Sequence, residues 1–319
     1  MNNYFHIGHK KIIDILKKQV KSQKIHHAYI FIGPPNVGKL DLAKYFASLI
    51  HEGKNKIKIR EKIDKGIHPD TMIVSPQKAK RSYRQSISIE KIKKVTNKIN
   101  LSPHSSKFKI GIISDAHLMT QEAANAFLKS LEEPPKASVL ILTTTNENKI
   151  LPTIISRCQK LYFGVVKREE ILKNLAAEKI NKRKAETISR LAAGRMGLAI
   201  RFREEKVLKN YQENLSILEK IFNFNDAEKI KKIEEISKTK DTSEILSDWL
   251  LYFRDLFAIQ KGLDKIVVNF DKIQEIKKWS KKISLEKNKK IIRAIIESQN
   301  LLAANANPKL VLENLVLLI

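Results

Sequence analysis

The sequence predicts an α/β protein with a parallel β-sheet in its first half, followed by regions that are entirely helical. Three observations predict this fold class. Short β-rich runs alternate with amphipathic helical segments as far as about residue 163. A glycine-containing loop, GPPNVGKL, follows the first β-rich run and opens a helix. Beyond residue 163 the spacing of apolar residues is helical throughout.

The first half of the chain alternates between the two kinds of element. Helices are expected at residues 10–22, 39–51, 88–100 and 120–132. Strands are expected at residues 27–33, 108–116 and 138–145. Residues 52–66 are rich in charge and predict a solvated, basic insertion. Strands separated by helices of this length indicate a parallel sheet with right-handed crossovers.

The second half of the chain predicts helices alone. Residues 168–204 predict two or three short helices, broken where Gly194 and Gly197 interrupt the segment AAGRMG. Residues 206–319 predict about five amphipathic helices, one of them carrying the apolar ridge Ile245, Leu246, Trp249, Leu250 and Phe253. We therefore predict three parts: a phosphate-loop core at 1–163, a small helical lid at 164–205 and a helical domain at 206–319.

Composition excludes several classes of protein. No apolar run reaches the roughly 18 residues that span a bilayer, and the first residues lack the apolar core of a secretion signal, so we expect a cytoplasmic protein without membrane contact. The single cysteine and eight scattered histidines predict no disulfide and no zinc site. The net charge of +27 favours nucleic acid or an acidic partner. Lysine is abundant along the whole chain, however, which weakens that inference.

The loop GPPNVGKL has most of what a phosphate-binding loop needs. Gly33 and Gly38 let the backbone amides face phosphate oxygens, and Lys39 would reach the outer phosphates. Leu40 stands where such loops carry serine or threonine, and it has no oxygen for Mg²⁺. Without a positioned metal, charge that develops on a transferred phosphoryl group is poorly neutralised.

The segment KIGIISDAHLMT is an apolar strand that ends in Asp115. Such a strand delivers a carboxylate to the edge of the sheet beside the phosphate loop, where it can help to hold a metal ion. Hydrolases of this type follow the aspartate with glutamate, which polarises the attacking water, but here Ala116 follows. The two motifs together predict a degenerate nucleotide site formed by Gly33, Gly38, Lys39 and Asp115.

Longer motifs make the resemblance to a known family specific. The segments EAANAFLKSLEEPP, TTTNENKILPTIISRC and LLAANANPKLVLENLVLLI, with HPD at 68–70, resemble the clamp-loader AAA+ subunits of bacterial replication over nearly the whole chain. The resemblance implies an AAA+ core, a helical lid and a helical collar that joins a heteropentamer. It also implies partners, namely the gamma/tau and delta subunits, and through the complex the sliding clamp and primed DNA.

The family's functional residues carry over to matching positions. The resemblance implies that Arg157 of the SRC motif is an arginine finger, which contacts ATP bound by a neighbouring subunit. Thr144 and Thr145 match the polar sensor, and Gly197 stands where ATP-binding members carry a second-sensor arginine. Many relatives carry a four-cysteine zinc module before HPD, and this chain has no cysteine there.

These observations predict a subunit that does not hydrolyse ATP itself and helps a neighbour to do so. No cofactor is required on this hypothesis, and ATP or ADP would bind weakly without hydrolysis. Two alternatives stay open. The chain could be an ATP-hydrolysing gamma/tau-type subunit, or a stand-alone DNA-binding AAA+ protein, as its charge would suggest.

Overall fold

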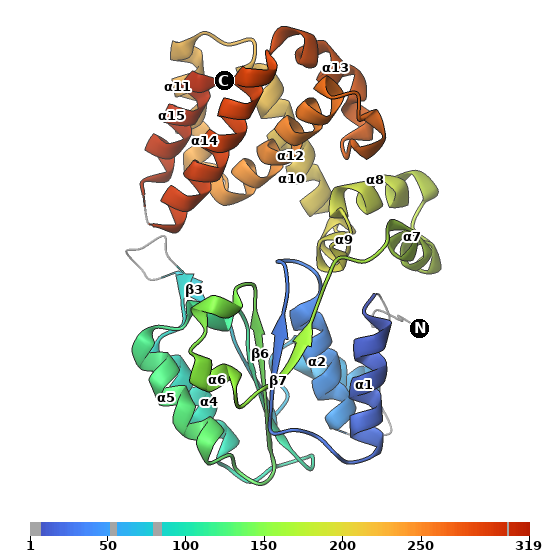
Figure 1. Cartoon of the computed structure of the whole chain (residues 1–319), viewed down its shortest axis with the longest axis vertical. Coiled ribbons are helices and arrows are strands. Elements are labelled where there is room, and N and C mark those ends of the chain that lie inside the picture. Colours follow the sequence, from blue (N-terminus) through green and yellow to red (C-terminus); the bar gives the residue numbers. More distant parts are fainter. Residues whose placement is uncertain (1–7, 52–55, 79–84, 305) are drawn as a thin grey trace. The chain divides into compact units, whose positions relative to one another are not determined.

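Figure 1 shows the computed structural model of the chain, which describes residues 8–51, 56–78, 85–304 and 306–319. The described residues form two compact units. The first contains the residues up to Lys78, then Gln85–Glu178 and Gly194–Leu198, and the second contains Lys179–Ala193 and Ala199–Ile319. Residues of the predicted lid therefore occur in both units, and the domain boundaries after residues 163 and 205 stay a prediction.

The first unit is built on a five-stranded parallel sheet with the strand order β2-β5-β6-β1-β7, which confirms the predicted fold class. The strands are β1 (Ala28–Ile32), β2 (Thr71–Val74), β5 (Lys109–Ile113), β6 (Ser138–Thr144) and β7 (Gln159–Tyr162). A separate antiparallel pair is formed by β3 (Gln77–Lys78) and β4 (Gln85–Ser86). Strand β1 lies between β6 and β7, so both of its neighbours come from distant parts of the sequence.

Helices cover both faces of this sheet (Figure 1). One side carries α1 (Lys10–Lys21) and α2 (Lys39–Ile50), with α3 (Lys56–Asp64) packed on α2. The other side carries α4 (Ile89–Ile99), α5 (Gln121–Glu132) and the short α6 (Pro152–Ile155). Because side chains alternate along a strand, Tyr29 and Phe31 of β1 contact the first group while Ile30 and Ile32 contact the second.

The segment predicted as a solvated insertion contains a helix. Residues 52–55 lie outside the described part of the chain, but α3 follows them and buries Ile63, which is 1% exposed. Arg60 is also buried, and it donates to Asp64 at 2.7 Å and to the backbone oxygen of Asp41 at 2.9 Å. Ile59 also packs, partly buried, against the same apolar cluster, so the prediction was wrong for this part because the many charges obscured two inward-facing apolar positions.

The helices that follow the sheet agree with the sequence pattern. The short helices are α7 (Arg168–Ala177), α8 (Lys182–Ala192) and α9 (Met196–Phe202). The longer ones are α10 (Glu205–Ile221), α11 (Asp226–Thr239), α12 (Thr242–Gln260), α13 (Ile273–Lys282), α14 (Leu285–Ala303) and α15 (Pro308–Leu318). None of the helices in the described ranges combines the length and apolarity that spanning a bilayer requires.

Helix α12 forms the centre of the C-terminal helices. It packs against α10, α13 and α14, and its Trp249, Tyr252 and Phe253 are fully buried. Four residues of the predicted apolar ridge are buried, and Leu250 is half-buried. The buried Asp255 accepts hydrogen bonds from the backbone amides of Val268 and Asn269, at 3.0 and 2.7 Å. Burying a carboxylate without hydrogen bonds would be costly. The two amides supply these bonds, and the bonds hold the connection between α12 and α13 against α12.

Candidate functional site

The phosphate loop lies at the carboxyl end of β1 and leads directly into α2. Gly38 precedes the first residue of α2 with φ at 97°, in the left-handed region that glycine adopts without strain. At Gly33 a Cβ atom would lie 2.3 Å from the backbone oxygen of Phe163, so only glycine fits there. The loop therefore occupies the position where parallel sheets bind ligands, outside the carboxyl ends of the strands.

The ammonium of Lys39 is bound to the loop itself. It is 6% exposed and donates to the backbone oxygens of Gly33 at 2.7 Å and Pro34 at 2.6 Å. Burial lowers the pKa of Lys39 to about 8, and the nearby carboxylate of Asp115 opposes this shift. Contact with a phosphate would require Lys39 to exchange both carbonyl contacts for phosphate oxygens.

Asp115 lies at the carboxyl end of β5, as predicted, and it is held by neighbouring strand ends. Its backbone amide donates to the hydroxyl of Thr143 at 3.0 Å, and its carboxylate accepts from Ser114 at 3.1 Å. Its φ of 51° turns the chain away from the sheet, and the next residue, Ala116, is buried. Asp115 therefore lies with Lys39 at one edge of the sheet, and the methyl group of Ala116 supplies no group that could orient water.

His117 connects the two threonines of the predicted sensor, and the sequence analysis did not identify it. Its Nδ1 lies 3.3 Å from the hydroxyl of Thr144, and its Nε2 lies 3.2 Å from the hydroxyl of Thr145. Burial lowers the pKa of His117 below its usual value, while Asp115 opposes the shift. The only signal in the sequence was a polar side chain two residues beyond the strand-ending aspartate.

Leu40 and Gly197, two of the three positions that differ from ATP-binding relatives, make identifiable contacts in the structure. Leu40 is half-buried and packs against the apolar cluster beneath α2. At Gly197 a Cβ atom would lie 2.8 Å from the backbone oxygen of Asn36 and 3.1 Å from the nitrogen of Gly38. The amide of Leu198 donates to the same oxygen of Asn36 at 3.1 Å. The start of α9 thus lies directly on the phosphate loop, and this contact has no room for an arginine side chain at position 197.

Arg157 lies near the amino ends of the strands, whereas the phosphate loop lies at their carboxyl ends. It precedes β7, whose Gln159 is aligned with Tyr29 of the neighbouring strand β1. The first residue of β7 is therefore four residues away from the level of Gly33, or about 13 Å along the strands at roughly 3.3 Å per residue, and Arg157 lies in the turn before it. The structure brings Gly33, Gly38, Lys39 and Asp115 together and leaves Arg157 apart from them.

The guanidinium of Arg157 has local partners. Its Nη1 donates to the backbone oxygen of Thr153 at 3.0 Å, and its Nη2 lies 3.2 Å from the carboxylate of Glu132, at the end of α5. The side chain remains 37% exposed. The next residue, Cys158, is buried, and burial raises the pKa of its thiol to about 12.

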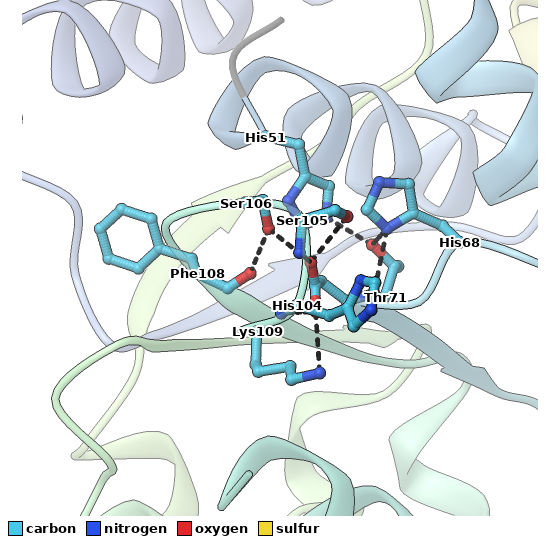
Figure 2. A network of polar contacts seen from close by, with 9 residues as sticks. His51, His68, Thr71, His104, Ser105, Ser106, Phe108 and Lys109 are labelled. Atoms are coloured by element: carbon cyan, nitrogen blue, oxygen red, sulfur yellow. Dashed lines mark hydrogen bonds and ion pairs between the residues drawn. The ribbon is translucent and has the colours of Figure 1, made fainter. Parts of the chain in front are cut away.

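The amino edge of the sheet is fixed by a buried polar network around Asp70, shown in Figure 2. Asp70 accepts hydrogen bonds from the backbone amides of His104 and Ser105, both at 2.7 Å, and pairs with Lys109 at 2.8 Å. Burial opposes the charge on Asp70, but these donors hold its pKa well below the usual range.

Two histidines adjoin this network, and their rings stack with centroids 4.2 Å apart (Figure 2). His51 ends α2 and contacts the hydroxyl of Thr71, and His68 begins the HPD motif. Burial, assisted by the neighbouring His68, lowers the pKa of His51 to about 3. The network therefore connects α2, β2 and β5 at this edge of the sheet.

A phosphate loop at the carboxyl edge of this parallel sheet, with helices on both faces and helical regions after it, defines an AAA+ type of P-loop protein. The chain belongs to the DNA polymerase III delta subunit family. The family model described as "DNA polymerase III, delta subunit" matches residues 8–167, and the model of the C-terminal part of the delta subunit matches residues 207–319. The resemblance to clamp-loader AAA+ subunits is thereby confirmed.

Two relatives from Bacillus subtilis agree with this assignment. The chain is 29% identical to the DNA polymerase III subunit delta' of Bacillus subtilis, over 97% of this chain and 95% of the relative. It is 24% identical to subunit tau of the same organism, over 96% of this chain but 59% of the relative. Among solved structures, a DNA polymerase III gamma subunit-related protein from Thermotoga maritima is 20% identical, with 95% and 97% of the two chains covered and a TM-score of 0.47.

Proposed function

We propose that this chain acts as the delta-prime subunit of a bacterial clamp loader. It does not hydrolyse ATP itself, and it supplies Arg157 to ATP on a neighbouring subunit while the sliding clamp is loaded onto primed DNA. The observation that carries this proposal is the separation of the two motifs across the sheet. Arg157 precedes β7, whose first residue already lies about 13 Å from the level of the phosphate loop at roughly 3.3 Å per strand residue, so its side chain points to no phosphate bound there. A phosphate contact by Arg157 would therefore be made to another chain.

The chemistry of the two groups fits these separate roles. A guanidinium stabilises charge on the γ-phosphate that the ATP-binding subunit cannot reach alone. In this chain's own nucleotide site, Lys39 is bound to backbone carbonyls, Leu40 packs against the core and Ala116, after β5, stands in place of the acidic residue. These features support weak binding of ATP or ADP without hydrolysis, and no cofactor of the chain's own is required.

Exposed apolar side chains support assembly through residues 206–319. Leu310 and Leu317 lie seven residues apart on α15 and are 56% and 47% exposed. Ile296 and Leu301 of α14 are each 45% exposed. Large apolar side chains gathered on packed helices are typical of protein contacts. We propose the gamma/tau and delta subunits as partners, in a cytoplasmic complex.

The test is co-purification of the chain with candidate gamma/tau and delta subunits. A stable complex is expected, and Leu310→Asp combined with Leu317→Asp should weaken it by at least about tenfold, since buried charge at a protein contact is costly. Leu263→Asp combined with Ile266→Asp is the matched control, because these residues are 51% and 61% exposed but lie on neither α14 nor α15. Failure of the wild-type chain to join any complex would contradict the proposal.

A second measurement separates this proposal from the gamma/tau-type alternative. The isolated chain should show no magnesium-dependent ATP hydrolysis above background. Turnover within about tenfold of a competent gamma/tau subunit, abolished by Lys39→Ala, would instead assign the chain to the ATP-hydrolysing type.

A further inference from the structure

Positive charge is concentrated where α13 meets α14. Residues 277–293, which we call the basic turn, carry eight lysine or arginine residues and one acidic residue, Glu286. Their net charge of +7 is about a quarter of the chain's +27, although the basic turn is about one-twentieth of the sequence. At the chain's average charge density a segment of this length would carry about +1.4, so the basic turn exceeds the average about fivefold.

The cations of the basic turn lie close together on the surface. Helices α13 and α14 are joined by Ile283 and Ser284 alone. At 1.5 Å per helical residue, all eight cations lie within about 15 Å of this link along the two helices. Six of them are exposed: Lys278, Lys281, Lys282, Lys287, Lys290 and Arg293.

Local structure explains only part of this charge. Among the described residues, carboxylates pair directly with two of the eight cations, since Lys277 lies 2.6 Å from Asp264 and Lys289 lies 2.8 Å from Glu286. Lys281 and Lys282 at the carboxyl end of α13 complement the helix dipole.

On α14, Lys287 donates to the backbone oxygen of Ile319 at 3.2 Å, but the helix dipole gives no reason for the cations there. Lys287, Lys289 and Lys290 lie in its first two turns, at the positive end of the dipole, where cations are unfavourable. Lys289 and Arg293, four residues apart on the same helix, repel each other. A ligand with closely spaced negative charges would relieve both effects.

The surroundings of the charges favour a polyanion over a protein partner. No large apolar side chain of the basic turn is exposed, within the residues that the structure describes. Its one aromatic residue, Trp279, stacks on Phe222 with ring centroids 4.3 Å apart, and Lys282 lies over the Trp279 ring at 4.8 Å. Protein interfaces depend on buried apolar or aromatic anchors, whereas contact with a phosphate backbone needs only cations.

We propose that the basic turn binds the phosphodiester backbone of DNA without sequence preference. This contact belongs to the C-terminal helices and does not depend on the phosphate loop, on Arg157 or on other subunits. It therefore goes beyond the proposed function, and it can be tested with the isolated full-length chain.

The experiment compares two triple variants with matched charge changes. The test variant is Lys278→Gln, Lys281→Gln, Lys290→Gln. The control variant is Lys206→Gln, Lys209→Gln, Lys231→Gln, which removes three exposed lysines from α10 and α11. Binding of fluorescein-labelled primer-template DNA is followed by fluorescence anisotropy, without nucleotide, from about 50 to about 200 mM salt.

We expect the test variant to bind at least about tenfold more weakly at the lower salt concentration. The slope of log K against log salt should become less steep by about 2.7, since each lost phosphate contact removes roughly 0.9. The control variant should keep the wild-type slope. Equal losses in both variants, or an unchanged slope in the test variant, would overturn the proposal.

Co-purification with gamma/tau and delta subunits distinguishes this proposal from the proposed function. The test variant should assemble like wild type. If it loses assembly, the basic turn is a subunit contact and the DNA proposal is wrong. If the wild-type chain itself does not assemble, the proposed function fails while the anisotropy result still decides the role of the basic turn.

Discussion

Arg157 and Glu132 form an ion pair, with Nη2 of the arginine 3.2 Å from the carboxylate. The two residues come from different motifs, Glu132 from LKSLEEPP and Arg157 from LPTIISRC. Their contact joins the end of α5 to the loop before β7 at the amino edge of the sheet. To reach a phosphate on another chain, the guanidinium must exchange Glu132 for phosphate oxygens, so Glu132 also determines how readily Arg157 is available.

Replacing Arg157 by alanine should leave assembly intact and impair clamp loading. A supplied arginine finger contributes roughly 10³ to 10⁵ in rate at one phosphoryl-transfer site. Other sites of the ring would keep their own arginines, so total ATPase should fall only partly while clamp transfer to primed DNA falls further. Arg157→Lys should not restore loading, because an ammonium lacks the planar fork of the guanidinium. Clamp-stimulated ATPase and clamp transfer are measured in reconstituted complexes.

Two controls accompany this variant. An exposed ion pair contributes roughly 0 to 1 kcal/mol, so Arg157→Ala should change the free energy of unfolding by no more than about 1 kcal/mol. Glu132→Gln also removes the ion pair but keeps the guanidinium, and it should retain clamp loading. Wild-type loading by an assembled Arg157→Ala complex would make Arg157 an ordinary surface residue.

Gly197→Ala should destabilise the chain, although the substitution lies inside helix α9. Gly197 is the second residue of α9, and in helices alanine is more favourable than glycine by up to about 1 kcal/mol. Here the new Cβ would lie 2.8 Å from a backbone oxygen of Asn36, which cannot move without shifting the phosphate loop. We expect a loss of about 1 to 3 kcal/mol in unfolding free energy, within the range for overpacking.

The control for this prediction is Gly164→Ala, because a Cβ at Gly164 would have no neighbour within 4 Å. It should leave stability nearly unchanged in denaturant titrations. A Gly197→Ala chain as stable as wild type would show that the start of α9 does not lie on the loop in solution.

Acid should destabilise the chain through His51. The folded chain holds the pKa of His51 at about 3, whereas the usual value is 6.5. Between these values the unfolded chain binds a proton that the folded chain does not, so this contribution to stability is full above pH 6.5 and is lost as the pH falls toward 3. His51→Gln should therefore flatten the decline in unfolding free energy between about pH 6.5 and pH 4.

His104→Gln is the matched control for the pH measurement. The backbone amide of His104 binds Asp70 at 2.7 Å, but its side chain is exposed. This variant should keep the wild-type pH dependence. Identical curves for His51→Gln and wild type would show that the titration of His51 does not contribute.

The purified chain should contain no stoichiometric zinc. One cysteine is present, and within the described ranges no group of three or more His, Cys, Asp or Glu side chains is placed to hold a metal ion. Elemental analysis after dialysis against a chelator is the measurement. One zinc ion per chain in that sample would contradict the prediction.

The sequence predicted those features of the fold that depend on local periodicity. The apolar runs that became β1, β5 and β6 and the spacing that became α2 and α12 are all local signals. The helical character of α3 was missed, because its one deeply buried apolar side chain, Ile63, stands among charges. Its burial depends on packing against α2, which no short window of sequence contains.

The candidate site was predictable in its residues but not in its geometry. Gly33, Gly38, Lys39 and Asp115 follow strands, so their meeting at the carboxyl edge was expected. The position of Arg157 near the amino ends of the strands depends on the pairing of β7 with β1. The paired residues of these two strands are about 130 positions apart in the chain. The contact of Gly197 with Asn36 likewise depends on a long-range approach of two backbones that no motif encodes.

The burial of Cys158 beside Arg157 gives the chain a natural chemical probe. The thiol has a pKa raised to about 12 and is the only cysteine in the sequence. Only the thiolate reacts with alkylating reagents, so Cys158 should be nearly inert to iodoacetamide at neutral pH while the turn before β7 keeps this conformation. Any rearrangement that frees the arginine and opens the turn before β7 would expose this sulfur. The rate of alkylation therefore measures how often the loop opens, in the isolated chain or in a complex, without an engineered label.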